Sequence, residues 1–272
     1  MIIDGHAHAC GEYLQAESIL HQLNTNNVDK VVLVPGELNS KKTYSLPNLG
    51  RLFPKRNTIV AINHISKVAI ALSGAAKHIY EGNANVHKMA SAYPERIIQF
   101  YWVRMGRPTA FTDLQDDYQK YQFKGIKLHQ CWERFRFHSS LFSQIGQFAL
   151  NHKLPLFAHV WSNSDLVEIL AYKKEHPELV LIIAHLFGVE SYIQSELTLP
   201  NVYFEISSPS LISNYRLKMA IQQLGANKII MGTDIPYGKN NLARTLERIR
   251  ALQISDEEKE LILGQNMAQI LT

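Results

Sequence analysis

Short apolar runs recur along the chain at intervals that suit buried strands. Residues 31–34 and 179–184, for example, are almost entirely Val, Ile, Leu and Ala. Continuous runs of this kind are typical of parallel strands that are buried on both faces. The strands predicted in this way cover residues 1–3, 31–34, 97–103, 124–130, 154–160, 179–187, 201–207 and 228–236.

Between most of these runs, apolar residues recur at the spacing of one helix face. Leu141, Ile145 and Phe148 form such a stripe, and a last helix begins at the capping box of Ser255 and Glu258. Parallel strands need crossover connections, and right-handed crossovers wind the sheet in one direction. The alternation therefore predicts an α/β fold, a (β/α)8 TIM barrel, with residues 1–272 as a single domain.

One long segment, residues 35–96, breaks the rhythm. It begins with an irregular stretch that is rich in Gly, Asn, Ser, Lys and Pro, and long connections of this kind tend to be functional. A short extended piece and one or two helices are expected after it. We therefore predict a long insertion between the second and third strands. The insertion contains His64, His78 and His87, of which His64 and His87 are the candidates for folding over a site.

Composition narrows the class of protein. The chain has 272 residues, 46% of them hydrophobic, and its net charge of +4 is not clustered, so nucleic acid is not an expected partner. The longest apolar run is too short to span a bilayer. The first residues lack the features of a signal peptide, and two cysteines do not make a disulfide framework. We expect a cytoplasmic protein that acts on a small molecule, and a homo-oligomer is compatible with this composition.

Histidines and an aspartate stand at the ends of the predicted strands. Two of them are separated by one residue, which places both imidazoles on the same side of the first strand. Reactive groups of a (β/α)8 barrel lie at the C-terminal ends of its strands, and imidazole and carboxylate groups are ligands for transition metals. The set that is expected to meet at the barrel mouth is His6, His8, His129, His159, His185 and Asp234.

These residues and the segments around them resemble the amidohydrolase superfamily. The matching segments are IDGHAHA, YPERI, KGIKLHQ, LPLFAHV, LIIAHLFG, NVYFEIS, MGTDIPYG and QNMAQIL. More narrowly, the chain is similar to the amidohydrolase-related branch that holds the aminocarboxymuconate-semialdehyde-decarboxylase-like enzymes. The resemblance covers nearly the whole chain except residues 35–85, and it implies a (β/α)8 barrel that holds a divalent metal.

The resemblance also implies a role for each matching residue. His185 matches a catalytic histidine beside the metal, and Asp234 matches the proton-shuttling carboxylate. Nitrogen and oxygen ligands favour zinc. Asp4 shares the strand face of His6, where it can orient that imidazole or make a core hydrogen bond. The positions of the metal ligands are matched by His6, His8, His159 and Asp234.

The fourth predicted strand decides the number of metal ions. Some members of the superfamily carry a lysine there that is carboxylated and bridges two metals. Lys127 and His129 share one strand face, so either can approach the centre. We favour one metal, with Lys127 or His129 touching substrate or water, and the bridged two-metal site is the alternative.

The leading hypothesis for function is hydrolysis of a small amide, lactone or ester by a metal-activated water. The alternative is a non-oxidative decarboxylase or another carbon–carbon lyase, because identical ligands serve both chemistries. A metal-dependent deoxyribonuclease is less favoured, since the fourth strand lacks the glutamate of a GEIGLD-like motif. A non-catalytic binding barrel is the remaining reading, and the full ligand set argues against it.

Basic and aromatic residues near the predicted mouth suggest the kind of substrate. Guanidinium groups grip carboxylates through paired hydrogen bonds, and aromatic walls suit planar molecules. A small organic acid is therefore a candidate substrate, while rim arginines that pair with acidic neighbours such as Glu133 are the alternative. The candidate substrate-binding residues are Lys127, His129, Arg104, Arg134, Arg136 and Trp161.

Overall fold

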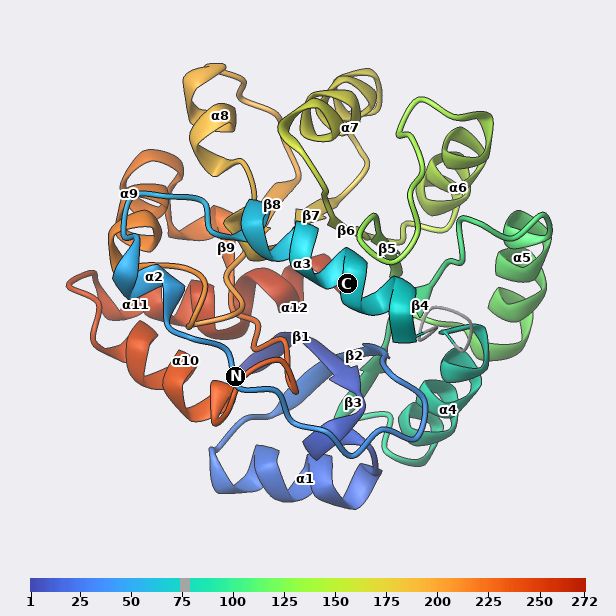
Figure 1. Cartoon of the computed structure of the whole chain (residues 1–272), viewed down its shortest axis with the longest axis horizontal. Coiled ribbons are helices and arrows are strands. Elements are labelled where there is room, and N and C mark those ends of the chain that lie inside the picture. Colours follow the sequence, from blue (N-terminus) through green and yellow to red (C-terminus); the bar gives the residue numbers. More distant parts are fainter. Residues whose placement is uncertain (74–78) are drawn as a thin grey trace.

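The computed structural model describes residues 1–73 and 79–272, except for the side chains of residues 69–73 and 79. In these ranges the paired strands run parallel, and most helices lie outside them (Figure 1). His78 lies outside the described residues. The strands are β1 (Ile3–Ala9), β2 (Lys30–Pro35), β3 (Ile97–Gln99), β4 (Tyr101–Trp102), β5 (Ile126–His129), β6 (Leu156–His159), β7 (Leu181–Ile183), β8 (Val202–Glu205) and β9 (Ile229–Ile230).

The strands pair in chain order, as β1-β2-β3 and as β4 to β9. The break between the two sets lies inside one predicted strand, residues 97–103, whose first half pairs with β2 and whose second half pairs with β5. The change of partner falls at one peptide, because the Phe100 N–H donates to the Leu33 carbonyl and the Tyr101 N–H donates to the Gly125 carbonyl. β3 and β4 are thus two parts of one barrel strand.

The last and first strands are joined by backbone hydrogen bonds. The Gly5 N–H donates to the Met231 carbonyl over 2.9 Å, and the His8 N–H donates to the Ile235 carbonyl over 2.8 Å. Ala7 and Ile235 form a parallel bridge in the same place. Hydrogen bonds therefore continue across the seam, and the predicted TIM barrel is confirmed.

The helices follow the predicted rhythm. α6 buries Ile145 and Phe148 of its expected stripe, and the capping box of Ser255 and Glu258 is formed at the start of α11. In the described ranges, no helix is both long and apolar enough to cross a membrane. The helices are α1 (Ala16–Thr25), α2 (Leu49–Leu52), α3 (Ile59–Ser73), α4 (Ile79–Ala92), α5 (Ala110–Tyr121), α6 (Ser140–Asn151), α7 (Asn163–Glu175), α8 (Val189–Gln194), α9 (Asn214–Leu224), α10 (Asn241–Arg250), α11 (Asp256–Glu260) and α12 (Asn266–Ile270).

The insertion between β2 and β3 contains α2, α3 and α4. The extended piece expected at its centre is instead the first turn of α3, which is anchored by the buried Ile59 and by a hydrogen bond from the Thr58 hydroxyl to the Leu211 carbonyl. α3 crosses in front of the strands (Figure 1). The insertion therefore folds over the end of the barrel where the predicted site residues lie.

Candidate metal centre

Three of the predicted metal ligands lie together at the end of β1 and just after β9. The Nε2 atom of His8 is 3.3 Å from Oδ1 of Asp234, and Nε2 of His6 is 3.8 Å from the same oxygen. His6, His8 and Asp234 form a buried group whose ligand atoms lie within 4.8 Å of one another. Closure of the barrel through β1 brings these two ends of the chain together.

Neighbouring backbone groups set the tautomer of His8. Its Nδ1 lies 2.8 Å from the Pro35 carbonyl, which can only accept, so Nδ1 carries the proton. In this tautomer the ring presents a bare Nε2 toward Asp234. A histidine that donates through one nitrogen and leaves the other bare is oriented as metal-ligating histidines are.

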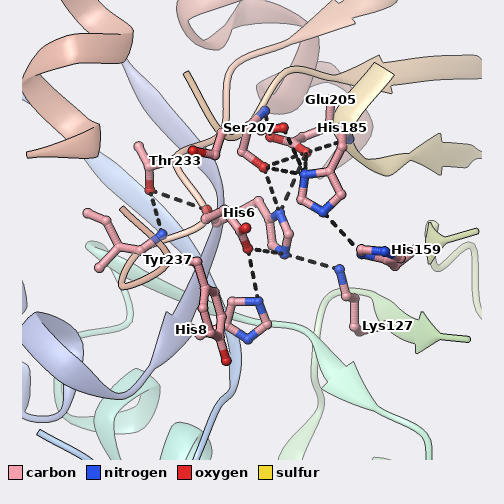
Figure 2. A network of polar contacts seen from close by, with 12 residues as sticks. His6, His8, Lys127, His159, His185, Glu205, Ser207, Thr233 and Tyr237 are labelled. Atoms are coloured by element: carbon pink, nitrogen blue, oxygen red, sulfur yellow. Dashed lines mark hydrogen bonds and ion pairs between the residues drawn. The ribbon is translucent and has the colours of Figure 1, made fainter. Parts of the chain in front are cut away.

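His6 is oriented by a hydroxyl and a carboxylate that belong to β8 and the loop after it. Its Nδ1 lies 3.2 Å from Oγ of Ser207 and 3.5 Å from Oε2 of Glu205. The Ser207 hydroxyl donates to Glu205, so its oxygen is free to accept from His6. This leaves Nε2 of His6 as the bare nitrogen, and Nζ of Lys127 lies 3.0 Å from it (Figure 2).

A second pair of histidines faces one another in the same network. Nδ1 of His185 donates to the Ser207 carbonyl over 2.8 Å, which leaves its Nε2 bare. That atom lies 3.1 Å from Nδ1 of His159. Nε2 of His159 lies 2.8 Å from Oδ1 of Asn63. Figure 2 shows His6, Lys127, His159 and His185 directed toward a common space.

The structure brings the predicted ligands together in overlapping groups. His6 lies with His8 and Asp234 and also with His185 and Glu205. His159 lies beside His185 and belongs to a further buried group with His129 and Cys131. The rings of His129 and His159 are stacked, with centroids 3.9 Å apart and planes 15° apart. Stacked rings direct their in-plane lone pairs side by side, so this last group does not converge on one ion.

Burial keeps the rings of His6 and His159 neutral. Burial is the largest cause of the low pKa of His6 and of the low pKa of His159. Lys127 lowers the pKa of His6 further, and His185 lowers the pKa of His159 further. Burial also lowers the pKa of Lys127 to about 7, against the opposing effect of Asp234 and Glu205. A neutral imidazole offers the lone pair that a metal needs.

The donor set fits a divalent metal. The bare Nε2 atoms of His6 and His8 and the carboxylate of Asp234 are neutral-imidazole and carboxylate ligands, which suit zinc, manganese and iron. The carboxylate of Glu205 lies behind His6 and His185, where it supports the orientation of both rings. A divalent cation would also give a partner to Nε2 of His185, which faces Nδ1 of His159 at 3.1 Å.

Two residues of the centre hold unusual backbone conformations. His185 has φ 62° and Asp234 has φ 57°, the left-handed region that costs a residue other than glycine some energy. Hydrogen bonds hold both turns: the His185 N–H donates to Glu205, and the Asp234 N–H donates to the His6 carbonyl. These two positions are the ones to which the family resemblance assigns catalytic roles.

A cavity of about 310 Å³ opens above the centre. Its floor includes His8, His129, His159, His185 and Asp234. The insertion forms much of its wall. The residues that the insertion contributes are Glu37, Lys42, Tyr44, Leu46, Ile59, Ile62, Asn63, Ile65 and Ser66, and the barrel adds Cys131, Trp132, Leu211 and Tyr237.

The predicted substrate-binding residues are distributed differently. His129 lines the cavity, and Lys127 lies beneath it against His6. Each arginine pairs with an acidic side chain: Arg104 with Glu133, Arg134 with Asp165, and Arg136 with Glu168. In the described part of the chain, the residues that line the cavity do not include these arginines or Trp161. Their part in substrate binding stays a prediction.

The remaining candidates lie outside the metal-binding groups. Asp4 accepts from the backbone N–H groups of His6 and Thr233 and from the Thr233 hydroxyl, so it makes a core hydrogen bond rather than orienting an imidazole. His64 is exposed on α3 and meets Trp161 edge-on. His87 stacks on Tyr121 among residues such as Met1, at the opposite end of the barrel.

Sequence reasoning missed three residues of the centre. Glu205 is fully buried, and the signal that could have revealed it is a charged residue inside the apolar segment NVYFEIS. Ser207 follows two residues later on the same strand end. Asn63 lies in the insertion, where no periodic pattern marks it, and only the folded structure shows that it reaches His159.

Comparison with known proteins identifies one matching family. A family model described as amidohydrolase matches residues 72–271 of the chain. This segment includes His129, His159, His185, Glu205 and Asp234, and it excludes the HAH sequence of β1. No curated protein matches the sequence.

Solved structures share the fold at low identity. An uncharacterised TIM-barrel protein from Bordetella bronchiseptica aligns at 14% identity over 99% of this chain and 98% of its own, with a TM-score of 0.71. 4-Oxalomesaconate hydratase from Rhodopseudomonas palustris aligns at 14% identity over 100% and 95%, with a TM-score of 0.66. 5-Carboxyvanillate decarboxylase from Novosphingobium aromaticivorans, a structure with bound manganese, aligns at 12% identity over 100% and 97%, with a TM-score of 0.67.

Proposed function

Because the chain belongs to the amidohydrolase family, an enzyme family of metal-dependent TIM barrels, we propose that it is a metal-dependent hydrolase of a small amide, lactone or ester. One observation carries the proposal. The bare nitrogens of His6 and His8 and the carboxylate of Asp234 converge below a cavity of about 310 Å³. Such an arrangement joins a metal-binding donor set to a space for a small substrate.

We assign the divalent metal to His6, His8 and Asp234, with His159 presenting its Nδ1 from the neighbouring side. Zinc is the proposed ion, since its usual ligands are imidazole and carboxylate. When bound, such an ion supplies Lewis-acid chemistry that activates water and polarises a carbonyl. The manganese of the solved decarboxylase is the other ion to be tested.

Asp234 is the proposed general base. Its carboxylate borders the cavity and is held by the turn in which its own N–H donates to the His6 carbonyl. In the reaction it accepts a proton from water as the oxygen attacks the carbonyl carbon. It then delivers that proton to the leaving nitrogen or oxygen as the carbon–heteroatom bond breaks.

His185 is the proposed partner for the negative charge that develops on the carbonyl oxygen. Its Nδ1 is held by the Ser207 carbonyl, and its backbone N–H is held by Glu205. The ring is thereby aimed at the cavity through Nε2, which donates to an oxyanion when it carries a proton. Rigid support matters because misplaced donors lose much of their effect.

The cavity wall suits a small organic molecule. Leu46, Ile59, Ile62 and Leu211 supply an apolar side, and Trp132 supplies an aromatic one. If the substrate carries a carboxylate, Lys42 is the cation of the described cavity lining that can meet it. Arg104, Arg134 and Arg136 are the rival candidates, and each would have to exchange its acidic partner for the substrate.

A two-ion centre is the alternative within the same function. The two ligand groups, His6–His8–Asp234 and His159–His185, could each hold one ion. Lys127 would then bridge them as a carbamate. Its burial and low pKa favour the neutral amine that reacts with carbon dioxide. The short contact between Lys127 and His6 is equally compatible with the one-ion site, in which the amine touches water or substrate.

A carbon–carbon lyase is the second candidate function. The apolar wall beside Trp132 favours it, because a carboxylate that loses its water on binding is destabilised relative to carbon dioxide. In that reaction the bond to the carboxyl carbon breaks, carbon dioxide leaves, and a proton from Asp234 or His185 adds to the carbon. Solved proteins of this fold include decarboxylases and a hydratase.

Product analysis separates the two functions. Metal-free protein, reloaded with zinc or with manganese, is incubated with panels of small amides, lactones, esters and aromatic acids. Hydrolysis is expected, with one acid group formed per turnover and full loss of activity after chelation. Stoichiometric release of carbon dioxide without hydrolysis would make the lyase the correct assignment. Turnover by metal-free protein would overturn both.

A further inference from the structure

A buried side chain of the insertion hydrogen-bonds to a histidine of the metal centre. Asn63 of α3 is 1% exposed, and its Nδ2 donates to the carbonyls of Val160 and Trp161 over 3.1 and 3.0 Å. Both acceptors follow β6, the strand that ends at His159. Two carbonyl partners fix which end of the amide is nitrogen, so Oδ1 is the atom that lies 2.8 Å from Nε2 of His159.

This orientation determines the proton position on His159. Oδ1 of Asn63 can only accept, so Nε2 of His159 must carry the proton, and the neutral ring keeps a bare Nδ1. That bare nitrogen faces the bare Nε2 of His185 at 3.1 Å. The other tautomer would let His159 donate from Nδ1 to His185. The pair would then be satisfied internally and would offer no nitrogen of His159 to a cation.

When Asn63 is replaced, the thiol of Cys131 can stabilise the other tautomer of His159, in which Nε2 is bare. Its Sγ lies 3.2 Å from Nε2 of His159. A thiol is a weak donor that could bond to a bare Nε2. The surroundings of His159 thus permit both tautomers, and the amide of Asn63 selects between them.

We propose that Asn63 is a positioning residue that holds His159 in the Nε2–H tautomer and so keeps its Nδ1 available to a metal ion. The proposal rests on the metal centre of the proposed function. It also links the substrate cavity to the metal. Ile59, Ile62 and Ser66 line the cavity from the same helix that carries Asn63.

The chain offers a matched control for this residue. Asn83 of α4 is also a fully buried asparagine of the insertion that bonds to barrel backbone. Its Nδ2 donates to the Trp102 carbonyl, and its Oδ1 accepts from the Trp102 N–H. Like Asn63, it joins the insertion to the barrel by hydrogen bonds. Its side chain bonds to the backbone of Trp102, however, and not to a histidine.

The first experiment reads the tautomer directly in metal-free protein. Histidine labelled with ¹⁵N distinguishes protonated from bare ring nitrogens by long-range NMR correlation, and the His159 signals are assigned by their loss in His159→Gln. Wild type and Asn83→Ala are expected to show the Nε2–H form, and Asn63→Ala is expected to gain the Nδ1–H form. An unchanged Nε2–H form in Asn63→Ala would overturn the proposal.

The second experiment measures affinity for Zn²⁺ by competition with a chelator. Asn63→Ala is expected to bind about 10- to 100-fold more weakly, the usual effect of losing a partner of a ligating histidine. Asn83→Ala should stay close to wild type. Asn63→Asp keeps the acceptor oxygen and loses the two N–H donors of Nδ2, so it should retain both the His159 tautomer and the affinity for Zn²⁺. This variant decides the test if Asn63→Ala fails to fold. An equal loss of affinity in Asn63→Asp would show that the hydrogen bonds from Nδ2 to the backbone, and not the acceptor Oδ1, maintain the affinity for Zn²⁺. That result would refute the proposal.

The two readouts separate this inference from the proposed function. If wild type bound no Zn²⁺, the metal centre would be wrong, and the NMR experiment would still decide what Asn63 does to His159. If wild type bound Zn²⁺ and Asn63→Ala changed neither tautomer nor affinity, the role of Asn63 would be wrong and the metal centre would stand.

Discussion

Nε2 of His8 lies 3.3 Å from Oδ1 of Asp234, although almost the whole chain separates the two residues. Closure of the barrel explains the contact. The His8 N–H donates to the carbonyl of Ile235, the residue after Asp234, so the seam between β1 and the segment after β9 fixes both side chains. The candidate metal centre therefore lies at the seam that closes the barrel, and its geometry depends on that seam.

Replacing Asp234 tests the proposed general base. Asp234→Asn keeps the size of the side chain but removes the carboxylate that accepts the proton. Turnover is expected to fall by about 10²- to 10⁴-fold, the usual contribution of a positioned base. The measurement is kcat of protein whose bound metal has been quantified, because Asp234 is also a proposed ligand. Full turnover by metal-loaded Asp234→Asn would show that another group takes the proton.

Glu205 is expected to act on the metal through the histidines beside it. Glu205→Gln retains the shape but places an amide N–H against the donating N–H of His185 or the hydroxyl of Ser207. Affinity for Zn²⁺ should fall by about 10- to 100-fold. The unfolding free energy of the metal-free protein should fall by about 1–3 kcal/mol, since a buried donor loses its acceptor.

Another glutamate provides the control for Glu205. Glu190 pairs with the buried Arg216, and in the described part of the chain its side-chain partners do not include a histidine of the centre. Glu190→Gln should weaken that ion pair and the stability of the fold while leaving the affinity for Zn²⁺ unchanged. If both variants lost affinity equally, the effect of Glu205 would be a general loss of stability.

Much of the fold could be predicted because local sequence patterns specify the strands and helices of the barrel. Buried parallel strands need continuous apolar runs, and the helices between them need apolar stripes, so both were visible before folding. The split of residues 97–103 into β3 and β4 was not predicted, since the change of partner at Phe100 involves strands elsewhere in the chain. The first turn of α3 was missed because its anchors, Ile59 and Thr58, act through tertiary contacts.

The site was predictable only where strand parity determines direction. The spacing of His6 and His8 indicates one shared face, and the structure places both beside Asp234. Sequence could not show that His159 would also face His185, because that contact depends on how β6 and β7 lie and on Asn63. The alternative that rim arginines pair with acidic neighbours such as Glu133 was open from the sequence. Which acidic residue pairs with each of Arg104, Arg134 and Arg136 was not, since no local pattern ties them together.

The number of metal ions tests the role of Lys127. We expect one ion per chain and a Lys127 amine of unmodified mass, as in the one-ion site. Lys127→Met should then bind one ion, with altered turnover because the amine that contacts His6 is gone. Metal analysis and intact-mass measurement in bicarbonate check this. Two ions, together with the added mass of carbon dioxide on Lys127, would establish the bridged centre instead.

The preference for carboxylated substrates tests Lys42. Lys42→Ala should raise KM for a carboxylated substrate by ~5-fold or less and leave a neutral analogue unaffected, because an exposed charge contributes only up to about 1 kcal/mol. Lys41→Ala is the matched control, since Lys41 is the exposed neighbour outside the described cavity lining. If Arg104→Ala, Arg134→Ala or Arg136→Ala abolished the preference while Lys42→Ala did not, the arginine assignment would be the correct one.

The most direct test of the account is anomalous diffraction from crystals grown with zinc, recorded on both sides of the zinc absorption edge. The account predicts a strong anomalous peak bounded by Nε2 of His6, Nε2 of His8 and the Asp234 carboxylate, with Zn–N distances of about 2.0–2.1 Å. An occupied zinc position elsewhere in the protein, with no peak between these three side chains, would contradict it.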